Sequence, residues 1–84
     1  MKIGIVGREV TVAEATAILD SYLAWMRKKH PKILTVITQH DDDIGRYVRS
    51  RARRLNIRRQ TVDRVTGRDT VVIDKTFLSI GHEP

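Results

Sequence analysis

The sequence predicts a small α/β domain with a Rossmann-like β-α-β-α-β-β order, in which a mainly parallel sheet ends in a C-terminal antiparallel hairpin. Two short apolar segments typical of buried strands each precede a segment with helical periodicity, and this alternation favours a parallel sheet. Two β-branched segments around a turn sequence then follow. The 84 residues suit one domain, which we expect to span residues 1–81, with residues 82–84 as a loose tail.

The N-terminal part predicts a strand followed by a long helix. Lys2 to Val6 is a short, mostly apolar run that Gly7 closes, and Thr11 to Glu14 has the sequence of a capping box. The basic run Arg27 to Lys29 suits the negative end of a helix dipole, and Pro31 ends the helix. Apolar residues recur between these ends at helical spacing: Ala15, Ile18, Leu19, Tyr22, Leu23 and Met26.

A second strand and helix follow. Ile33 to Thr38 is β-branched and apolar on both faces, as expected of a buried parallel strand. Asp41 to Asp43 supply an N-cap and first-turn carboxylates for a helix from Ile44 to about Leu55. Asn56 is placed to end this helix, because asparagine tolerates the left-handed conformation of a C-terminal cap.

The C-terminal part predicts the hairpin. Gln60 to Val65 and Thr70 to Ile73 flank the turn sequence Thr66-Gly67-Arg68-Asp69. Phe77 to Ile80 either adds a last strand or covers the sheet. If both helices lie on one face, the other face needs a cover, which the terminal segment or a second subunit could supply. We therefore expect a homodimer, and Trp25 is either a half-buried rim residue or an interface anchor.

Composition excludes several classes of protein. There is no cysteine for a disulfide framework or a thiolate metal site, which fits a cytoplasmic protein. No stretch approaches the roughly 20 apolar residues of a membrane span, and the N-terminal apolar run is too short for a signal peptide. Nucleotide-binding glycine motifs and a cysteine nucleophile are both missing. The sequence therefore favours a binding protein without a cofactor over an enzyme.

Polar residues follow the first two predicted strands, where ligands bind in open parallel sheets. Gly7 allows a tight turn and a close backbone approach, and Arg8 places a cation beside it. Thr38, Gln39 and His40 follow the second strand and offer hydrogen-bonding groups. These five residues form the predicted site for a small polar ligand.

Gly4-Ile5-Val6-Gly7-Arg8 resembles the opening strand and Gly-Ser-Arg turn of the SLOG superfamily. Val36 through Ile57 is similar to the strand, glycine-rich loop and helix of these Rossmann-like proteins, which include the DNA-processing protein DprA and the LOG cytokinin-activating enzymes. In this chain Gln39, His40 and Asp42 replace loop glycines, and the LOG Pro-Gly-Gly-x-Gly-Thr-x-x-Glu motif is absent. The resemblance implies a scaffold for nucleotide derivatives or single-stranded DNA, without phosphoribohydrolase activity.

The acidic run Asp41 to Asp43 has two interpretations. The favoured one is that these carboxylates cap the second helix and pair with nearby arginines, so no metal site is predicted. The alternative is that Asp41, Asp43 and His40 hold a hard divalent cation, or that Glu9 joins them in a nuclease centre. Carboxylates at this helix end compete for its amide groups and repel phosphate, so we place no phosphate directly there.

The most uneven feature of the chain is its arginine content. Nine arginines and one acidic residue lie between Arg46 and Arg68, a net charge of +8 in 23 residues, whereas the whole chain carries +6. Arginine outnumbers lysine eleven to five, a bias that suits bidentate phosphate contact. The predicted nucleic-acid surface combines one helix face with the start of the next strand: Arg46, Arg49, Arg53, Arg58 and Arg59.

Arg51 differs from these residues because it projects within the apolar stripe of the second helix. Its stem either extends along the rim of the core, or its guanidinium is partly buried and aimed at a ligand phosphate or a carboxylate. We include it among the predicted ligand-binding residues. Tyr47 is the only aromatic residue inside the basic stretch, so a base-stacking platform there has little support.

Three functional hypotheses follow. The first is a SLOG-like, non-catalytic protein that binds a nucleotide or nucleotide-derived ligand at the strand ends. The second is a nucleic-acid-binding protein that uses the surface from Arg46 to Arg59. The third is a protein encoded by a virus or mobile element whose charged faces bind a host protein.

Overall fold

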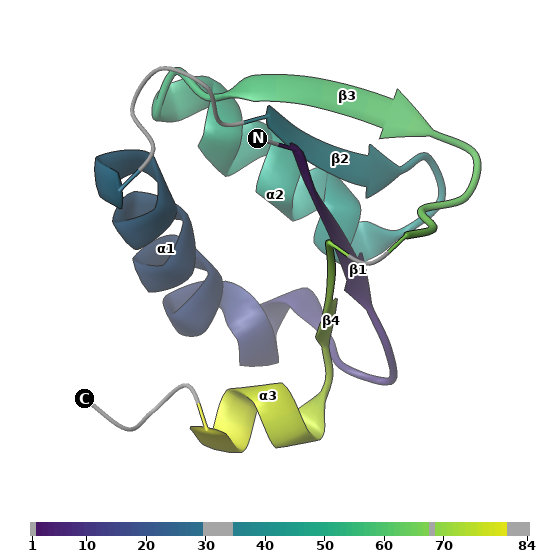
Figure 1. Cartoon of the computed structure of the whole chain (residues 1–84). Coiled ribbons are helices and arrows are strands. Elements are labelled where there is room, and N and C mark those ends of the chain that lie inside the picture. The colour runs from purple at the N-terminus through teal and green to yellow at the C-terminus, as the bar shows by residue number, and fades with distance from the viewer. Residues whose placement is uncertain (1, 30–34, 68, 81–84) are drawn as a thin grey trace.

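The computed structural model describes residues 2–29, 35–67 and 69–80 (Figure 1). It confirms the α/β class and a form compatible with a small Rossmann-like fold. The predicted tail, residues 82–84, lies outside the described residues. The elements in chain order are β1 (Lys2–Gly7), α1 (Val12–Lys29), β2 (Thr35–Gln39), α2 (Asp43–Arg54), β3 (Arg58–Val62), β4 (Thr70–Ile73) and α3 (Lys75–Ile80).

The four strands form one sheet in the order β3-β2-β1-β4, and every neighbouring pair is parallel. Register pairs Thr35 of β2 with Lys2 of β1 on one side and with Arg58 of β3 on the other, while Gly4 of β1 pairs with Thr70 of β4. The predicted antiparallel hairpin is therefore wrong, because β3 and β4 occupy opposite edges of the sheet.

The strand predicted over Gln60 to Val65 is instead Arg58–Val62, and residues 63–67 and 69, on either side of Arg68, which lies outside the described residues, pass across the face of the sheet opposite the helices (Figure 1). The N–H of Val65 donates to the side-chain oxygen of Gln39 at 3.0 Å, and the N–H of Gly4 donates to the carbonyl of Asp69 at 2.8 Å. A Cβ on Gly4 would lie only 2.4 Å from Cγ1 of Val65. The missing side chain of Gly4 thus lets the segment lie directly on β1 and cover part of that face.

The hydrophobic core lies between the other face of the sheet and the two long helices. It contains most of the apolar residues that recur at helical spacing in α1 and α2, because this spacing turns one face of each helix toward the sheet. Phe77 and Leu78 of α3 pack against it, so the C-terminal segment covers the core as a short helix and adds no strand. The fully or nearly buried members are Ile5, Ala15, Leu19, Leu23, Met26, Val36, Ile44, Val48, Ala52, Ile57 and Ile73.

Helix α2 ends as the sequence predicts. Asn56 adopts φ of 60°, and its N–H donates to the carbonyl of Arg53 at 3.2 Å. The N–H of Ile57 donates to the carbonyl of Ala52 at 2.8 Å, which completes a Schellman cap. The side chain of Arg27, near the end of α1, donates to the carbonyl of Leu55. The C-terminal ends of the two long helices therefore lie side by side.

Candidate nucleic-acid interface

The crevice predicted between the carboxyl ends of β1 and β2 is filled by the chain itself. Asp42 caps α2 by accepting from the N–H of Ile44 at 3.1 Å, and it also accepts from the N–H of Gly7 at 2.8 Å. A Cβ on Gly7 would lie 2.3 Å from Cγ1 of Ile44. Gly7 thus allows α2 to approach β1 closely, and a carboxylate already occupies the amide groups that could bind an anion.

The predicted ligand residues of β2 point in different directions. Thr38 is fully buried, and its hydroxyl accepts from Nη1 of Arg49 at 2.8 Å. Gln39 projects to the opposite face, where it binds the N–H of Val65. His40 is exposed, with Nε2 3.8 Å from a carboxylate oxygen of Asp63. These three residues do not converge on one ligand in this arrangement.

The acidic run behaves as the favoured interpretation predicts. Asp42 caps α2, and Asp43 pairs with Arg46, whose Nη1 lies 3.7 Å from Oδ1 of Asp43. Within residues 2–29, 35–67 and 69–80, no three acidic, histidine or cysteine side chains are grouped closely enough to hold a metal ion. The same residues include no helix with the length and apolar character needed to cross a membrane.

The strand order places the topological switch point between β1 and β4, since β2 and β3 lie on one side of β1 and β4 lies on its other side. A shallow hollow of about 180 Å³ lies there, lined by Arg8, Glu9, Asp74, Lys75 and Thr76. Two cations and two carboxylates face it, so its charge is balanced. The hollow differs from the predicted crevice, with which it shares only Arg8.

The α2 arginines do not form the single solvent-facing stripe that helical spacing predicts. Arg46 is exposed and pairs with Asp43. Arg49 is half-buried and bonds to β2, donating to the Gln39 carbonyl at 2.9 Å as well as to Thr38. Of the three arginines in the predicted stripe, only Arg53 is exposed without an acidic partner among the described side chains. The prediction was wrong for Arg49, because it lies on the flank of the helix that borders the sheet.

Arg51 connects the two long helices. Its Nε lies 3.0 Å from Oδ1 of Asp20 in α1, an ion-pair distance, although the N–H is not aligned for a hydrogen bond. Tyr47 donates its hydroxyl proton to the same carboxylate oxygen. Burial and this hydrogen bond raise the pKa of Tyr47. Arg51 therefore has a carboxylate partner within the chain, and it lies two helical turns from the carboxyl ends of the strands.

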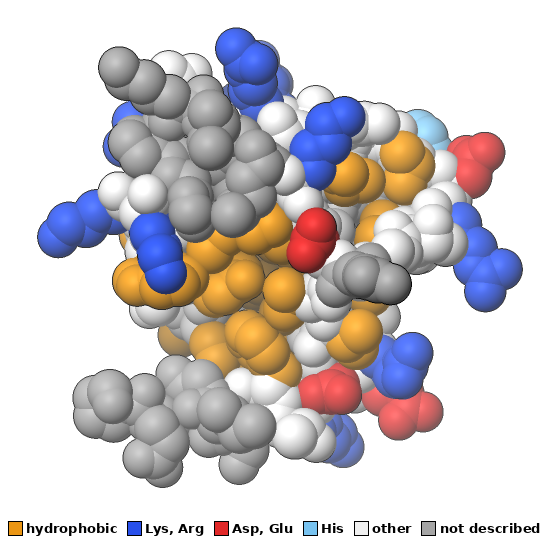
Figure 2. Space-filling view, in the orientation of Figure 1, with side chains coloured by type: hydrophobic (Ala, Val, Ile, Leu, Met, Phe, Trp, Pro, Cys, Tyr) orange, Lys and Arg blue, Asp and Glu red, His pale blue; other side chains and the backbone are white. Residues whose placement is uncertain are grey.

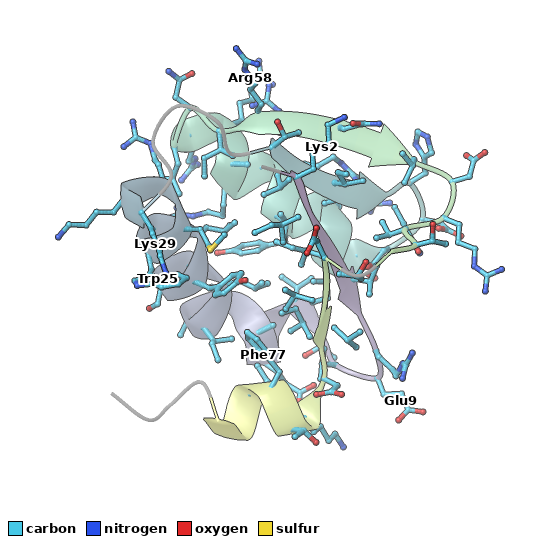
Figure 3. All side chains as sticks on the ribbon, viewed as in Figure 1. Lys2, Glu9, Trp25, Lys29, Arg58 and Phe77 are labelled. Carbon is cyan, nitrogen blue, oxygen red and sulfur yellow. The ribbon has the colours of Figure 1, made fainter. Side chains whose placement is uncertain are left out.

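Seven exposed cationic side chains gather at the opposite end of the sheet, where α1 and α2 end and β3 begins. We call this surface the basic edge: Arg27, Lys28, Lys29, Arg53, Arg54, Arg58 and Arg59. In Figure 3, Arg58 and Lys29 lie at the end of the molecule away from Glu9. Figure 2 shows only Lys and Arg among charged side chains at the upper and left margins, whereas Asp and Glu lie mainly to the right.

The separation of charge follows from the topology. All strands are parallel and both long helices run back against them. The segments that follow the strands therefore meet at one end of the sheet, where the carboxyl ends of the strands lie. Acidic residues follow every strand at that end: Glu9, Asp41, Asp42, Asp43, Asp63 and Asp74. The helix ends and the start of β3 meet at the other end of the sheet, where the seven residues of the basic edge lie.

An exposed aromatic residue borders the basic edge. Trp25 is 53% exposed and stands in the last two turns of α1, beside Lys28 and Lys29. Trp25 lies far from the arginine-rich segment in the sequence, so composition alone does not join it to the basic surface. The helical spacing of Trp25 from Lys28 and Lys29 was the available signal.

Comparison with protein-family models, with curated proteins and with solved structures found no match.

Proposed function

We propose that the protein binds nucleic acid, with little sequence preference, through the basic edge. The observation that carries this proposal is the convergence of cationic side chains from α1, α2 and β3, which are separated in sequence, on one exposed end of the sheet. Lys and Arg that neutralise phosphates supply most of the affinity in non-specific binding, because they release counterions from the polymer.

Helix capping and solubility explain only part of this surface. Basic residues in the last turns of α1 and α2 complement the helix dipoles, and Arg27 does so directly at the carbonyl of Leu55. Arg58 and Arg59 belong to β3 and not to a helix, and Nη1 of Arg59 donates to the carbonyl of Ile57 at 3.1 Å. No described carboxylate pairs with Arg53, Arg54, Arg58 or Arg59. Unpaired guanidinium groups in such a cluster suit phosphate, which arginine can bind through two hydrogen bonds.

The test compares two variants with the same change in charge. Replacing Arg53, Arg54, Arg58 and Arg59 with Gln alters the basic edge. Replacing Arg8, Arg46, Arg64 and Lys75 with Gln alters the opposite end of the sheet, where the carboxyl ends of the strands lie. Each set lowers the net charge from +6 to +2. Fluorescence anisotropy with labelled oligonucleotides at several salt concentrations gives the affinity and its salt slope. The basic-edge variant should lose most of its binding and up to about 3.6 units of the slope on duplex DNA.

Two results would overturn the proposal. One is the absence of measurable DNA or RNA binding at low salt. The other is an equal loss of affinity in both variants, because net charge alone would then explain the binding.

Nucleotide binding, as the SLOG resemblance implies, is a second candidate, and the hollow at the switch point supports it. Arg8 and Lys75 are the cations of this hollow, and strand ends at a switch point are the usual ligand position in such sheets. A thermal-shift screen with nucleotides and cyclic nucleotides tests it in the wild-type protein and in Arg8→Gln. Stabilisation that Arg8→Gln abolishes would support this candidate, and an unchanged midpoint with every ligand at millimolar concentration would reject it.

A further inference from the structure

Trp25 is unusual because a large apolar side chain is left in solvent. Every other described large hydrophobic residue is buried or half-buried, whereas Trp25 is 53% exposed. A single exposed apolar residue needs no explanation by itself. The surroundings of Trp25 do suggest an explanation, because they hold the ring in place and make the surface around it positively charged.

The ring of Trp25 is supported from the core. Tyr22 stacks with it at a centroid distance of 6.2 Å and an interplanar angle of 29°. Tyr22 in turn meets the ring of Phe77 edge-on, at 5.8 Å and 88°. Tyr22 and Phe77 both pack against the hydrophobic core. Figure 3 shows Trp25 and Phe77 on the same side of the molecule, Trp25 on α1 and Phe77 on α3. A ring held in this way loses little conformational freedom when a flat ligand stacks on it.

The surface around Trp25 is cationic. Nζ of Lys29 lies 4.9 Å from the ring centroid, in a cation–π contact. Trp25, Lys28 and Lys29 line an open hollow of about 360 Å³. Lys28 and Lys29 are also members of the basic edge, so the hollow and the phosphate-binding surface are continuous. A nucleobase could take the place of the ammonium group over the ring, which would release Lys29 to contact a phosphate.

We propose that Trp25 is a stacking platform for an unpaired base, so that the basic edge binds single-stranded nucleic acid in preference to duplex. The inference rests on the proposed nucleic-acid binding and specifies its substrate. Only an unpaired base exposes its face for stacking, whereas a duplex offers the surface mainly phosphates. A second copy of the chain fits this position less well, because a two-fold contact through Trp25 would bring Lys28 and Lys29 close to their counterparts.

Trp25 is the only tryptophan of the chain, so its fluorescence reports on this ring alone. Titration with a single-stranded oligonucleotide should quench the emission, and it should also shield Trp25 from acrylamide. The same sequence as a duplex should bind with little quenching. Trp25→Ala should weaken single-strand binding roughly 5- to 150-fold and leave duplex binding nearly unchanged. Trp25→Phe keeps an aromatic face, so its affinity for the single strand should lie between those of wild type and Trp25→Ala.

The outcomes separate this inference from the proposed function. If oligonucleotides bind, but Trp25 is not quenched and Trp25→Ala binds single strands as tightly as wild type, the stacking platform is rejected and the basic edge stands. If nothing binds at low salt, both are rejected. If wild type sediments as a dimer and Trp25→Ala as a monomer, the ring is a subunit contact and the inference is overturned. Circular dichroism should first show that Trp25→Ala keeps the wild-type helix content.

Discussion

The carboxylate of Asp42 accepts a hydrogen bond from the backbone N–H of Gly7 at 2.8 Å, although the two residues are 35 positions apart. This bond joins the start of α2 to the end of β1, and the same side chain also caps α2. An anion approaching these amide groups would therefore have to displace a carboxylate. The carboxylate of Asp42 thus fills the crevice, and the cluster of guanidinium groups without a described acidic partner, Arg53, Arg54, Arg58 and Arg59, lies at the other end of the sheet.

Asp42→Ala should lower the free energy of unfolding by about 2–3 kcal/mol, because it removes an N-cap and leaves the Gly7 N–H without its partner. Asp41→Ala is the matched control, since Asp41 is exposed and should change stability by less than about 0.5 kcal/mol. Urea unfolding measures both. Equal losses in the two variants would show that the bond to Gly7 contributes nothing.

Gly7→Ala should destabilise the protein by about 1–3 kcal/mol, because the new methyl group would lie 2.3 Å from Cγ1 and 2.8 Å from Cβ of Ile44. Relief would require α2 to move away from the sheet. Gly4→Ala meets Cγ1 of Val65 at 2.4 Å, but that side chain belongs to a connecting segment and can shift. The midpoint of thermal unfolding should be lower for Gly7→Ala than for Gly4→Ala. The reverse order would contradict the prediction that α2 yields less easily than the segment containing Val65.

Arg49→Met should lower stability by about 1–3 kcal/mol without weakening nucleic-acid binding. The substitution removes the donor to the buried hydroxyl of Thr38 and to the carbonyl of Gln39. Arg46→Met removes only an exposed pair and should cost less than about 0.5 kcal/mol. Unfolding and anisotropy measurements on the same samples separate the roles. Loss of binding in Arg49→Met, at unchanged stability, would return Arg49 to the binding surface.

Asn56→Ala should lower the free energy of unfolding by about 1 kcal/mol, since alanine is disfavoured at the φ of 60° that residue 56 adopts. Asn56→Gly should match or slightly exceed wild-type stability, because glycine reaches this conformation without strain. Chemical denaturation of the two variants compares them directly. If both substitutions cost the same, the side chain of Asn56 stabilises the cap by a route other than its backbone conformation.

Tyr47 should make the protein less stable at alkaline pH. Burial and the hydrogen bond to Asp20 raise the pKa of Tyr47 in the folded protein, so the unfolded chain loses this proton first as pH rises. The free energy of unfolding should therefore fall from about pH 10 upward. Tyr47→Phe should be less stable by about 1 kcal/mol at pH 7, and this deficit should shrink above pH 10. A deficit independent of pH would refute the raised pKa.

Local patterns in the sequence predict most of the elements but not the connection of the last two strands. The capping box, the apolar stripes and Asn56 each act within a few residues, and α1, α2 and β1 appear close to the predicted bounds. The turn sequence around Gly67 also suggests a local structure, namely a hairpin. However, the seven residues between β3 and β4 are enough for the chain to cross the sheet. Gly4 leaves room for Val65 on β1, and such packing between distant segments is not contained in any local pattern.

The candidate site shows the same division. The excess of arginine indicates an anionic partner, but which arginines face solvent depends on how α2 lies on the sheet. Arg49 bonds to β2 and Arg51 pairs with Asp20, one of the two kinds of partner predicted for it, so packing gives both side chains partners within the chain. Arg27, Lys28 and Lys29 join the surface only because α1 and α2 end together. The homodimer and the host-protein partner stay predictions, although residues 63–67 and 69 supply part of the cover for which a second subunit was invoked.

The position of β1 in the sheet has a consequence for how the chain folds. One neighbour of β1 is β4, in which Thr70 pairs with Gly4 although the two residues are 66 positions apart. The other neighbour, β2, follows β1 in the chain after a single helix. Loop-closure entropy delays such distant pairing, so β4 should dock after the first three strands have assembled. Until then β1 presents an unpaired backbone edge that can recruit strands from other molecules. Refolding yield should therefore depend strongly on protein concentration.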